Sequence, residues 1–245
     1  MITFPITLFK ADGVYPAIFN SAVQIIDPSD LSTVNGISVG DPLAQIDDIT
    51  ANGNHYIQGT SGDRPILRAG YIEGVSSDFM LCGTGVSKLS NHTVLVVYKL
   101  DGLGINQTII GDAISSGATR TRSITVQARS DNKTRGSFGD GTNSRITTAS
   151  TSATTNISLF NSRFPADSGA LEELEIDGNA QTEVDTSGTA TSIGGTAYQM
   201  AMFRTGEFSG NYMVGNINFI AIWSSRLSDT NNAIATDYLL NRFGI

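Results

Sequence analysis

The sequence contains very little cysteine and proline and has no long apolar run. Cys82 is the only cysteine among 245 residues, so the chain can form neither an internal disulfide nor a structural zinc site built on several thiolates. The six prolines are dispersed, and no proline-rich or charged linker divides the chain. No stretch approaches the roughly 18 consecutive apolar residues that a transmembrane helix needs. We therefore expect no membrane span, and a fold held by its core alone, with Cys82 as a small buried residue.

The N-terminus also lacks the features of a secretory signal. Lys10 and Pro5 interrupt its apolar part, and no basic region precedes it. We expect no signal peptide and synthesis in a reducing cytoplasm, a setting that suits a chain without disulfides.

The chain has an excess of acidic residues. Fifteen Lys and Arg face 23 Asp and Glu, which gives a formal charge of −8 and a sequence pI near 4.6. Such a surface repels phosphate, so we expect no direct nucleic-acid binding. One local cluster of residues is basic, in contrast to the acidic chain as a whole. We interpret it as the solvated face of an exposed hairpin. The alternative is a contact with an acidic partner or a sugar carboxylate. The cluster comprises Arg120, Arg122, Arg129, Lys133 and Arg135.

Glycine is frequent, with 26 residues, and charged residues make up only 16%. Short apolar runs interleaved with Gly, Ser, Thr and Asn predict an all-β sandwich with many turns. The run from His92 to Leu100 is almost entirely apolar and β-branched, which predicts a strand buried on both faces. Residues 142–156 are mostly Ser, Thr and Asn, and composition allows either an exposed loop or edge strands with polar faces. Strands are expected at about 54–58, 64–68, 78–81, 92–99, 107–111, 122–129, 156–161, 171–177, 198–204 and 215–223.

The C-terminal residues predict a short amphipathic helix after the strand at 215–223. Ser228 is a natural N-cap, because its hydroxyl can accept from the free amides of the first turn. An apolar stripe follows, and the helix is expected to end at Gly244. The stripe comprises Ile234 and Tyr238, four apart, with Ala235, Leu239 and Phe243.

This segment resembles the closing strand and helix of the laminin-G-like, concanavalin-A-type domains of many phage and bacterial surface proteins. The similar pieces are a turn with an aromatic residue and Gly at 211–215, a strand at 217–223 in which Asn218 replaces the usual acidic residue, Leu-Ser at 227–228 and YLLNRFG at 238–244. Upstream, four more pieces follow the family order: DPSDLSTV at 27–34, VGDPL at 39–43, IDD with NGNH at 46–55, and RPIL at 64–67. The family's aromatic-Asp-Gly turn is degraded here to EGVSSDF at 73–79.

The resemblance implies a concanavalin A-like jelly roll, a two-sheet β-sandwich with a short C-terminal helix. It covers residues 25–245, which we expect to form one laminin-G-like domain. Residues 1–24 precede it and are either an assembly arm or an edge strand that completes the same sandwich. If they form an arm, deleting residues 1–20 leaves a folded domain that no longer assembles.

The most tempting catalytic pattern is Glu175-Ile176-Asp177 followed by Glu183. Glucanases of this fold carry two glutamates on one strand face, close enough for retaining hydrolysis. Here the Asp177-Gly178 turn separates the two glutamates, so we interpret Glu175 as a solvent-facing strand residue and expect no enzyme.

The two histidines, His55 and His92, lie in no nucleophile motif and are expected to be structural.

Two weaker sites are candidates. Calcium, the one realistic cofactor, could be held by hard oxygen ligands, although turns and caps are the alternative role of these aspartates. Sugars stack on aromatic rings near turns, although core or turn packing is the more common role of most of these rings. Trp223 is assigned to the core. The possible calcium ligands are Asp27, Asp30, Asp47 and Asp48, and the possible glycan or partner contacts are Tyr56, Tyr71, Phe138, Tyr198, Phe208 and Tyr212.

Together these observations favour a non-catalytic phage virion protein, either a capsid decoration protein or a tail appendage. The expected partners are other virion proteins, with the chain as a homo-oligomer, and possibly a surface glycan. The alternative is a carbohydrate-binding module for host-surface glycans, and a distant alternative is a glycan hydrolase.

Overall fold

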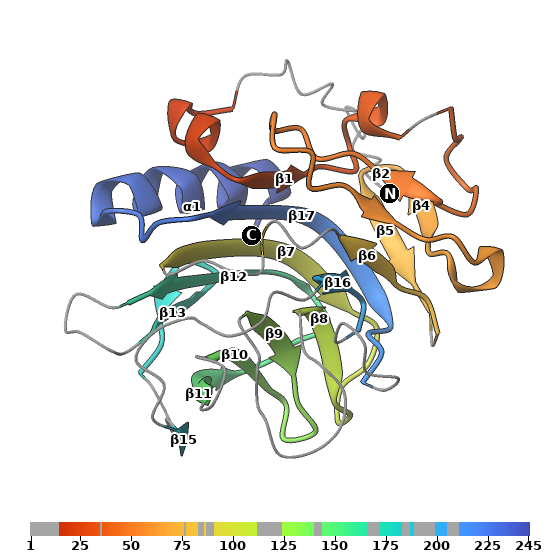
Figure 1. Ribbon diagram of the computed structural model, residues 1–245. Coiled ribbons are helices and arrows are strands. Elements are labelled where there is room, and N and C mark those ends of the chain that lie inside the picture. The colour runs from red at the N-terminus through yellow and green to blue at the C-terminus, as the bar shows by residue number, and fades with distance from the viewer. Residues whose placement is uncertain are drawn as a thin grey trace, which may run out of the picture.

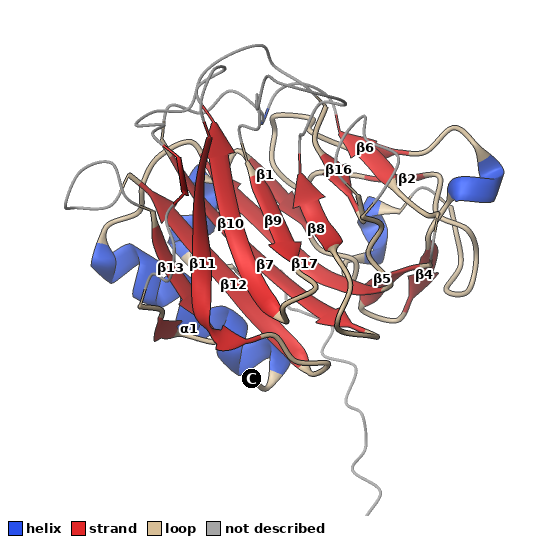
Figure 2. Cartoon of the chain, turned by 90° about the horizontal axis from the view of Figure 1, so that it is seen from below, coloured by secondary structure: helices blue, strands red, loops and turns tan. Residues whose placement is uncertain are grey.

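The computed structural model shows two antiparallel β-sheets packed face to face, with one helix on the outside (Figures 1 and 2). It describes residues 15–34, 36–75, 77–82, 86, 91–111, 124–139, 144–165, 172–182, 187–188, 199–204 and 211–245. Within this described part, no helix has the length and apolar character needed to cross a membrane.

The first sheet has the order β14-β13-β12-β7-β17-β5-β4, and β1 also pairs with β17. Its strands are β1 (Gln24–Ile26), β4 (Ile66–Arg68), β5 (Tyr71–Gly74), β7 (His92–Leu100), β12 (Ile157–Phe164), β13 (Glu173–Ile176), β14 (Asn179–Ala180) and β17 (Gly215–Trp223).

The second sheet has the order β15-β11-β10-β9-β8-β16-β6-β3-β2. Its strands are β2 (Gln45–Ile46), β3 (Tyr56–Ile57), β6 (Met80–Cys82), β8 (Gln107–Gly111), β9 (Thr125–Ala128), β10 (Lys133–Gly139), β11 (Ser144–Ser152), β15 (Ser187–Gly188) and β16 (Ala201–Met202). Short 3-10 helices, η1 (Ala17–Ser21), η2 (Leu31–Thr33) and η3 (Ser61–Asp63), lie in the first third of the chain.

The polar stretch at 142–156 is resolved in favour of a strand. Residues 144–152 form β11, which pairs with β10 on one side and with β15 on the other, and residues 153–156 follow it as a loop. The described members of the basic cluster, Arg129, Lys133 and Arg135, lie in a hairpin, as predicted, with Asn132 at φ 59° in the turn between β9 and β10. Its face is less solvated than expected, because Arg135 pairs with Asp131 at 2.6 Å and the Lys133 ammonium donates to the Ser150 carbonyl. Arg120 and Arg122 lie outside the described residues.

The central strand β7 is buried on both faces, which confirms the prediction from its sequence. Val94, Val96 and Tyr98 belong to the core between the two sheets. Leu95 and Val97 point to the opposite face and belong to a second apolar cluster with Phe219. The first sheet is therefore sandwiched between the second sheet and an outer layer.

Helix α1 (Asp229–Phe243) supplies most of that outer layer, together with η1 (Figure 1). Ser228 caps it by accepting from the Asn231 amide at 3.4 Å, and Gly244 ends it in the left-handed region at φ 68°. Both predicted ends are confirmed. Ala235 and Leu239 are fully buried against the sheet, but the predicted stripe is wrong at Ile234, which is 45% exposed. Ile234 precedes Ala235 by one residue, and one residue turns about 100° around the helix.

The start of the described chain packs on the same outer face. The rings of Tyr15 and Phe19 meet Phe219 and Tyr238, and Phe19 also meets Trp223, which lies in the core as predicted. Strand β1 then pairs with β17. Residues 15–24 thus complete their own sandwich, whereas residues 1–14 lie outside the described residues, and the assembly arm stays a prediction there.

Candidate functional site

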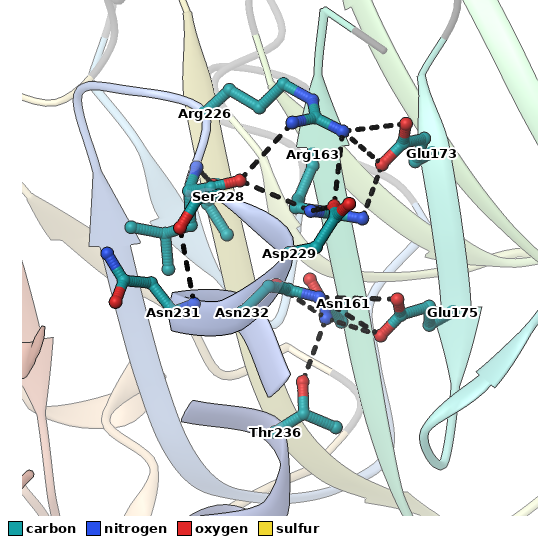
Figure 3. Close-up of polar contacts among 12 residues, drawn as sticks. Asn161, Arg163, Glu173, Glu175, Arg226, Ser228, Asp229, Asn231, Asn232 and Thr236 are labelled. Carbon is teal, nitrogen blue, oxygen red and sulfur yellow. Dashed lines mark hydrogen bonds and ion pairs between the residues drawn. The ribbon is translucent and has the colours of Figure 1, made fainter. Parts of the chain in front are cut away.

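Polar side chains gather on the outer face of β12 and β13, beneath one edge of α1 (Figure 3). Asn161 is the cross-strand partner of Glu175, and Arg163 is the partner of Glu173. Directly paired residues share one face of a sheet, so all four side chains point toward the helix. The sequence predicted that Glu175 faces solvent on this strand and did not predict the helix that covers this face.

An ion-pair network fixes the N-terminal end of α1 to this face. The guanidinium of Arg163 lies 2.6 Å from Glu173 and 2.6 Å from Asp229, in the first turn of the helix. Arg226 approaches the same Glu173 carboxylate at 2.7 Å. Arg163 also donates to the Leu227 carbonyl at 3.2 Å. Its charge is thus satisfied by protein groups on several sides.

A hydrogen-bonded cluster of amides and a carboxylate continues along the helix. The Asn161 amide nitrogen lies 2.8 Å from Glu175 and 3.0 Å from both Asn232 and Thr236. Asn232 donates to the same carboxylate at 3.3 Å. Burial raises the pKa of Glu175, against the opposing effect of the Arg163 charge. The expectation of a solvent-facing Glu175 is therefore wrong, since the helix half-buries it.

The turn after β13 is confirmed, with Asp177 at φ 53° and Gly178 at φ 72°. The Asp177 carboxylate accepts from the Leu159 amide at 2.7 Å, and burial raises its pKa. A side chain at Gly178 would come within 2.9 Å of Leu240, so the turn fits closely under the helix. Glu183, the second glutamate of the glucanase-like pattern, lies outside the described residues.

Two pockets open along this side of α1. The first, of about 390 Å³, lies over the amide cluster, and the second, of about 580 Å³, lies at the C-terminal end of the helix. Asp177 lines both, so we treat them as one feature, the α1 groove. The first pocket is lined by Arg163, Glu175, Asp177, Gly178, Asp229, Asn232, Ala233, Thr236, Asp237 and Leu240, and the second by Lys99, Thr154, Thr155, Asn156, Ile157, Asp177, Phe243, Gly244 and Ile245.

The helix residues of the groove repeat at helical spacing. Asp229, Asn232, Ala233, Thr236, Asp237 and Leu240 recur every three or four positions and form one mainly polar stripe. The same spacing rule that found the apolar stripe could have found this one. It was missed because a polar stripe on an amphipathic helix is ordinarily interpreted as solvated.

The aromatic residues predicted to contact glycans do not converge. Tyr56 and Phe138 are fully buried in the core, where no sugar can reach their rings, so those two assignments are wrong. Tyr71 and Tyr212 are partly exposed, but neither lines the α1 groove. Tyr198 and Phe208 lie outside the described residues. The described aromatic ring that does line the groove is that of Phe243.

Asp27, one of the possible calcium ligands, is buried and satisfied by protein donors. Its carboxylate accepts from Arg242 at 2.6 Å, from the Tyr15 hydroxyl at 2.6 Å and from the Ser29 hydroxyl at 2.7 Å. Burial, followed by the neighbouring Asp27 charge, raises the pKa of Tyr15. Asp27 belongs to the DPSDLSTV segment at 27–34 and Arg242 to the YLLNRFG segment at 238–244. This ion pair therefore connects the first and the last of the family-like motifs.

The other three aspartates also accept from protein donors, Asp48 and Asp30 from backbone amides and Asp47 from a side-chain amide. Asp48 accepts from the amides of Ile25 and Asn54 at 2.9 and 3.0 Å, Asp30 caps η2 through the Ser32 amide, and Asp47 accepts from Gln45 at 2.6 Å. Within the described part of the chain, no group of three or more His, Cys, Asp or Glu residues could hold a metal ion. These aspartates therefore do not form a common cluster.

The histidines and the cysteine occupy structural positions. His55 accepts from the Asp48 amide at 3.0 Å, and burial lowers the pKa of His92 to about 3, which keeps it neutral. Cys82 is buried, as predicted, and burial raises the pKa of its thiol to about 12. A thiol with such a pKa is a poor nucleophile at neutral pH.

No protein-family model and no curated protein matches the sequence. Solved structures do match the fold. The botulinum neurotoxin serotype D ligand binding domain, solved with N-acetylneuraminic acid, has a TM-score of 0.61 at 12% identity over 91% of this chain and 52% of its own. The binding domain of Paraclostridial Mosquitocidal Protein 1 has a TM-score of 0.60 at 9% identity, over 91% and 53%. Trypanosoma rangeli sialidase has a TM-score of 0.56 at 12% identity, over 91% and 33%.

The chain thus spans about half the length of the toxin domains and a third of the sialidase. At such low identities the likeness establishes the fold alone. Together with the two antiparallel sheets and the C-terminal helix, it shows that the chain has the lectin-like fold, a concanavalin A-like β-sandwich.

Proposed function

We propose that the protein is a non-catalytic carbohydrate-binding domain and that the α1 groove is its binding site. The observation that carries the proposal is the lining of the 580 Å³ pocket, where Phe243 lies among Lys99, Asn156, Asp177 and two threonines. Sugars are recognised by a ring that takes an apolar sugar face, combined with a few polar groups that hydrogen-bond its hydroxyls. The lectin-like fold and the sugar named for one toxin domain support this choice.

The non-catalytic part rests on the state of the groove carboxylates. Retaining hydrolysis needs a nucleophile and an acid about 5 Å apart, both free to act. Glu175 is instead engaged by Asn161 and Asn232, and Asp177 is engaged by the Leu159 amide. Both are built into the joint between helix and sheet.

A glycan array followed by calorimetric titration tests the proposal. We expect micromolar binding to a defined oligosaccharide class, weakened at least about tenfold, or about 1.4 kcal/mol, when Thr155→Arg fills the pocket. Thr230→Arg adds the same charge on an exposed α1 position outside the groove and is expected to leave binding unchanged. Absence of any glycan binding contradicts the proposal. Cleavage of a polysaccharide that disappears in Glu175→Gln contradicts its non-catalytic part.

The virion setting is a second candidate that rests on the resemblance of the sequence motifs. The ion pair between Asp27 and Arg242 gives those motifs a structural role. Such a role is compatible with a capsid or tail protein that uses the sandwich as a scaffold. Mass spectrometry of purified virions tests it: hundreds of copies indicate a capsid component, a few indicate a tail component, and absence contradicts it.

A further inference from the structure

The α1 groove carries an excess of negative charge. Four carboxylates line it against two cations. Asp237 is exposed on the helix and has no hydrogen bond or ion pair from its carboxylate to another described residue. The acidic lining comprises Glu175, Asp177, Asp229 and Asp237, and the cations are Lys99 and Arg163.

Both lining cations already lie next to a carboxylate of the protein, Arg163 tightly and Lys99 loosely. Arg163 is bound by Glu173 and Asp229, each at 2.6 Å, and its side chain is only 10% exposed. Lys99, at the other end, lies 3.4 Å from Asp101. A ligand carboxylate could bind Arg163 only by displacing one of its partners. Lys99, whose side chain is 40% exposed, is the more accessible of the two cations. The net charge of the whole chain, −8, opposes the approach of an anionic ligand.

A second observation concerns a residue beneath the groove lining, Asn161, which lines neither pocket itself. The amide oxygen of Asn161 has no hydrogen-bond partner among the described residues, although the side chain is almost fully buried next to Glu175, Asn232 and Thr236 (Figure 3). This unpaired oxygen adds an acceptor directly beneath lining residues, without being in contact with the pocket. The groove therefore presents more acidic than cationic groups among the described residues, with Asp237 as its unpaired carboxylate and Lys99 as its accessible cation.

From this charge distribution we infer, on the basis of the proposed function, that the groove takes neutral or amino-bearing oligosaccharides and disfavours carboxylated ones. The ligand class is a hexosamine-type chain whose hydroxyls and amines donate to the acidic lining. The preferred sugar would be neutral or positively charged, whereas N-acetylneuraminic acid, the sugar in the structure of one toxin domain of the same fold, is negatively charged. The shared fold does not carry the sugar preference, because charge at the site comes from individual side chains.

Titration with three oligosaccharides of equal length tests the inference: an N-acetylated hexosamine oligomer, its de-N-acetylated form at a pH that protonates the amine, and a chain bearing carboxylates. We expect the amino form to bind most tightly and the carboxylated form least tightly. Added salt should weaken binding of the amino form and leave the N-acetylated form nearly unchanged, because salt screens charges near the surface.

Two matched variants localise the effect. Asp237→Asn removes one groove charge and should reduce the preference for the amino form by between about 1.5-fold and fivefold, the range of an exposed charge pair. Asp131→Asn removes one charge at the β9–β10 turn and should leave that preference unchanged. Carboxylated chains that bind as tightly as the N-acetylated chain, or equal effects of the two variants, overturn the inference while glycan binding stands. If none of the three chains binds, both the proposed function and this inference fail.

Discussion

Helix α1 meets the sandwich through two sides of opposite character. On one side Ala235 and Leu239 press against the apolar face of β7 and β17, next to Phe219. On the other side Asn232 and Thr236 meet Asn161 and Glu175 of β12 and β13 through hydrogen bonds. On the apolar side Ala235 and Leu239 are fully buried, whereas the polar side borders the α1 groove. One helix can therefore stabilise the fold through its apolar side and form part of a candidate binding site through its polar side.

The largest loss of unfolding free energy is expected for the buried ion pair between Arg242, near the C-terminal end of α1, and Asp27. Arg242→Met leaves the Asp27 carboxylate, 1% exposed, without its cation, and one broken buried pair typically costs about 3–5 kcal/mol of unfolding free energy. Urea denaturation measures the loss. Arg242→Met combined with Asp27→Asn should recover part of it, since no buried charge then remains. A loss below about 1 kcal/mol in the single variant would show that the Asp27–Arg242 ion pair contributes little to stability.

Leu239→Ala removes a fully buried side chain from the centre of the apolar side. The expected loss of unfolding free energy is about 3 kcal/mol, from lost transfer energy and the cavity left behind. Ile234→Ala, on the exposed side of the same helix, is the control and should stay within about 0.5 kcal/mol. Equal losses in the two variants would contradict the assignment of the buried stripe.

Thr236→Val tests the polar side with a side chain of the same shape. It deletes the hydroxyl that lies 3.0 Å from the Asn161 amide and is expected to cost about 1 kcal/mol of unfolding free energy. Thr230→Val, at an exposed position on the helix, controls for the change in helix propensity. If Thr236→Val loses as much unfolding free energy as Leu239→Ala, the two sides of α1 stabilise the fold equally. That result would contradict the contrast between them.

The smallest effect concerns pH. The pKa of Glu175 is raised in the folded state, so the folded protein holds this proton more tightly than the unfolded chain does. Between the unfolded and folded pKa values the folded state binds more protons, and the contribution of Glu175 to stability falls as the pH rises. Glu175→Gln cannot ionise, so its stability relative to wild type should increase from pH 4 to pH 7. Urea denaturation at both pH values measures this change. If the unfolding free energy of Glu175→Gln minus that of wild type falls from pH 4 to pH 7, the prediction is contradicted.

Local patterns in the sequence predicted the elements that local physics controls. The Ser228 cap and Gly244 set the ends of α1, and the Asp177-Gly178 turn ends β13, because each depends on a few neighbouring residues. The apolar run in β7 likewise predicted burial on both faces. The failures concern contacts across the chain: Tyr56 and Phe138 were kept as possible glycan contacts but are buried, and Glu175 was interpreted as solvent-facing but lies under the helix.

The sequence by itself determined the fold class, the strong central strand and the closing helix, since periodicity, caps and turns act over a few residues. Only the tertiary structure decided that Asp27 pairs with Arg242, 215 positions away, and that Glu175 lies under the helix. It also decided that the second stripe of α1 faces a groove. Those outcomes depend on how the sheets and the helix pack, because burial and ion pairing are set by neighbours in space, which spacing along the chain does not specify.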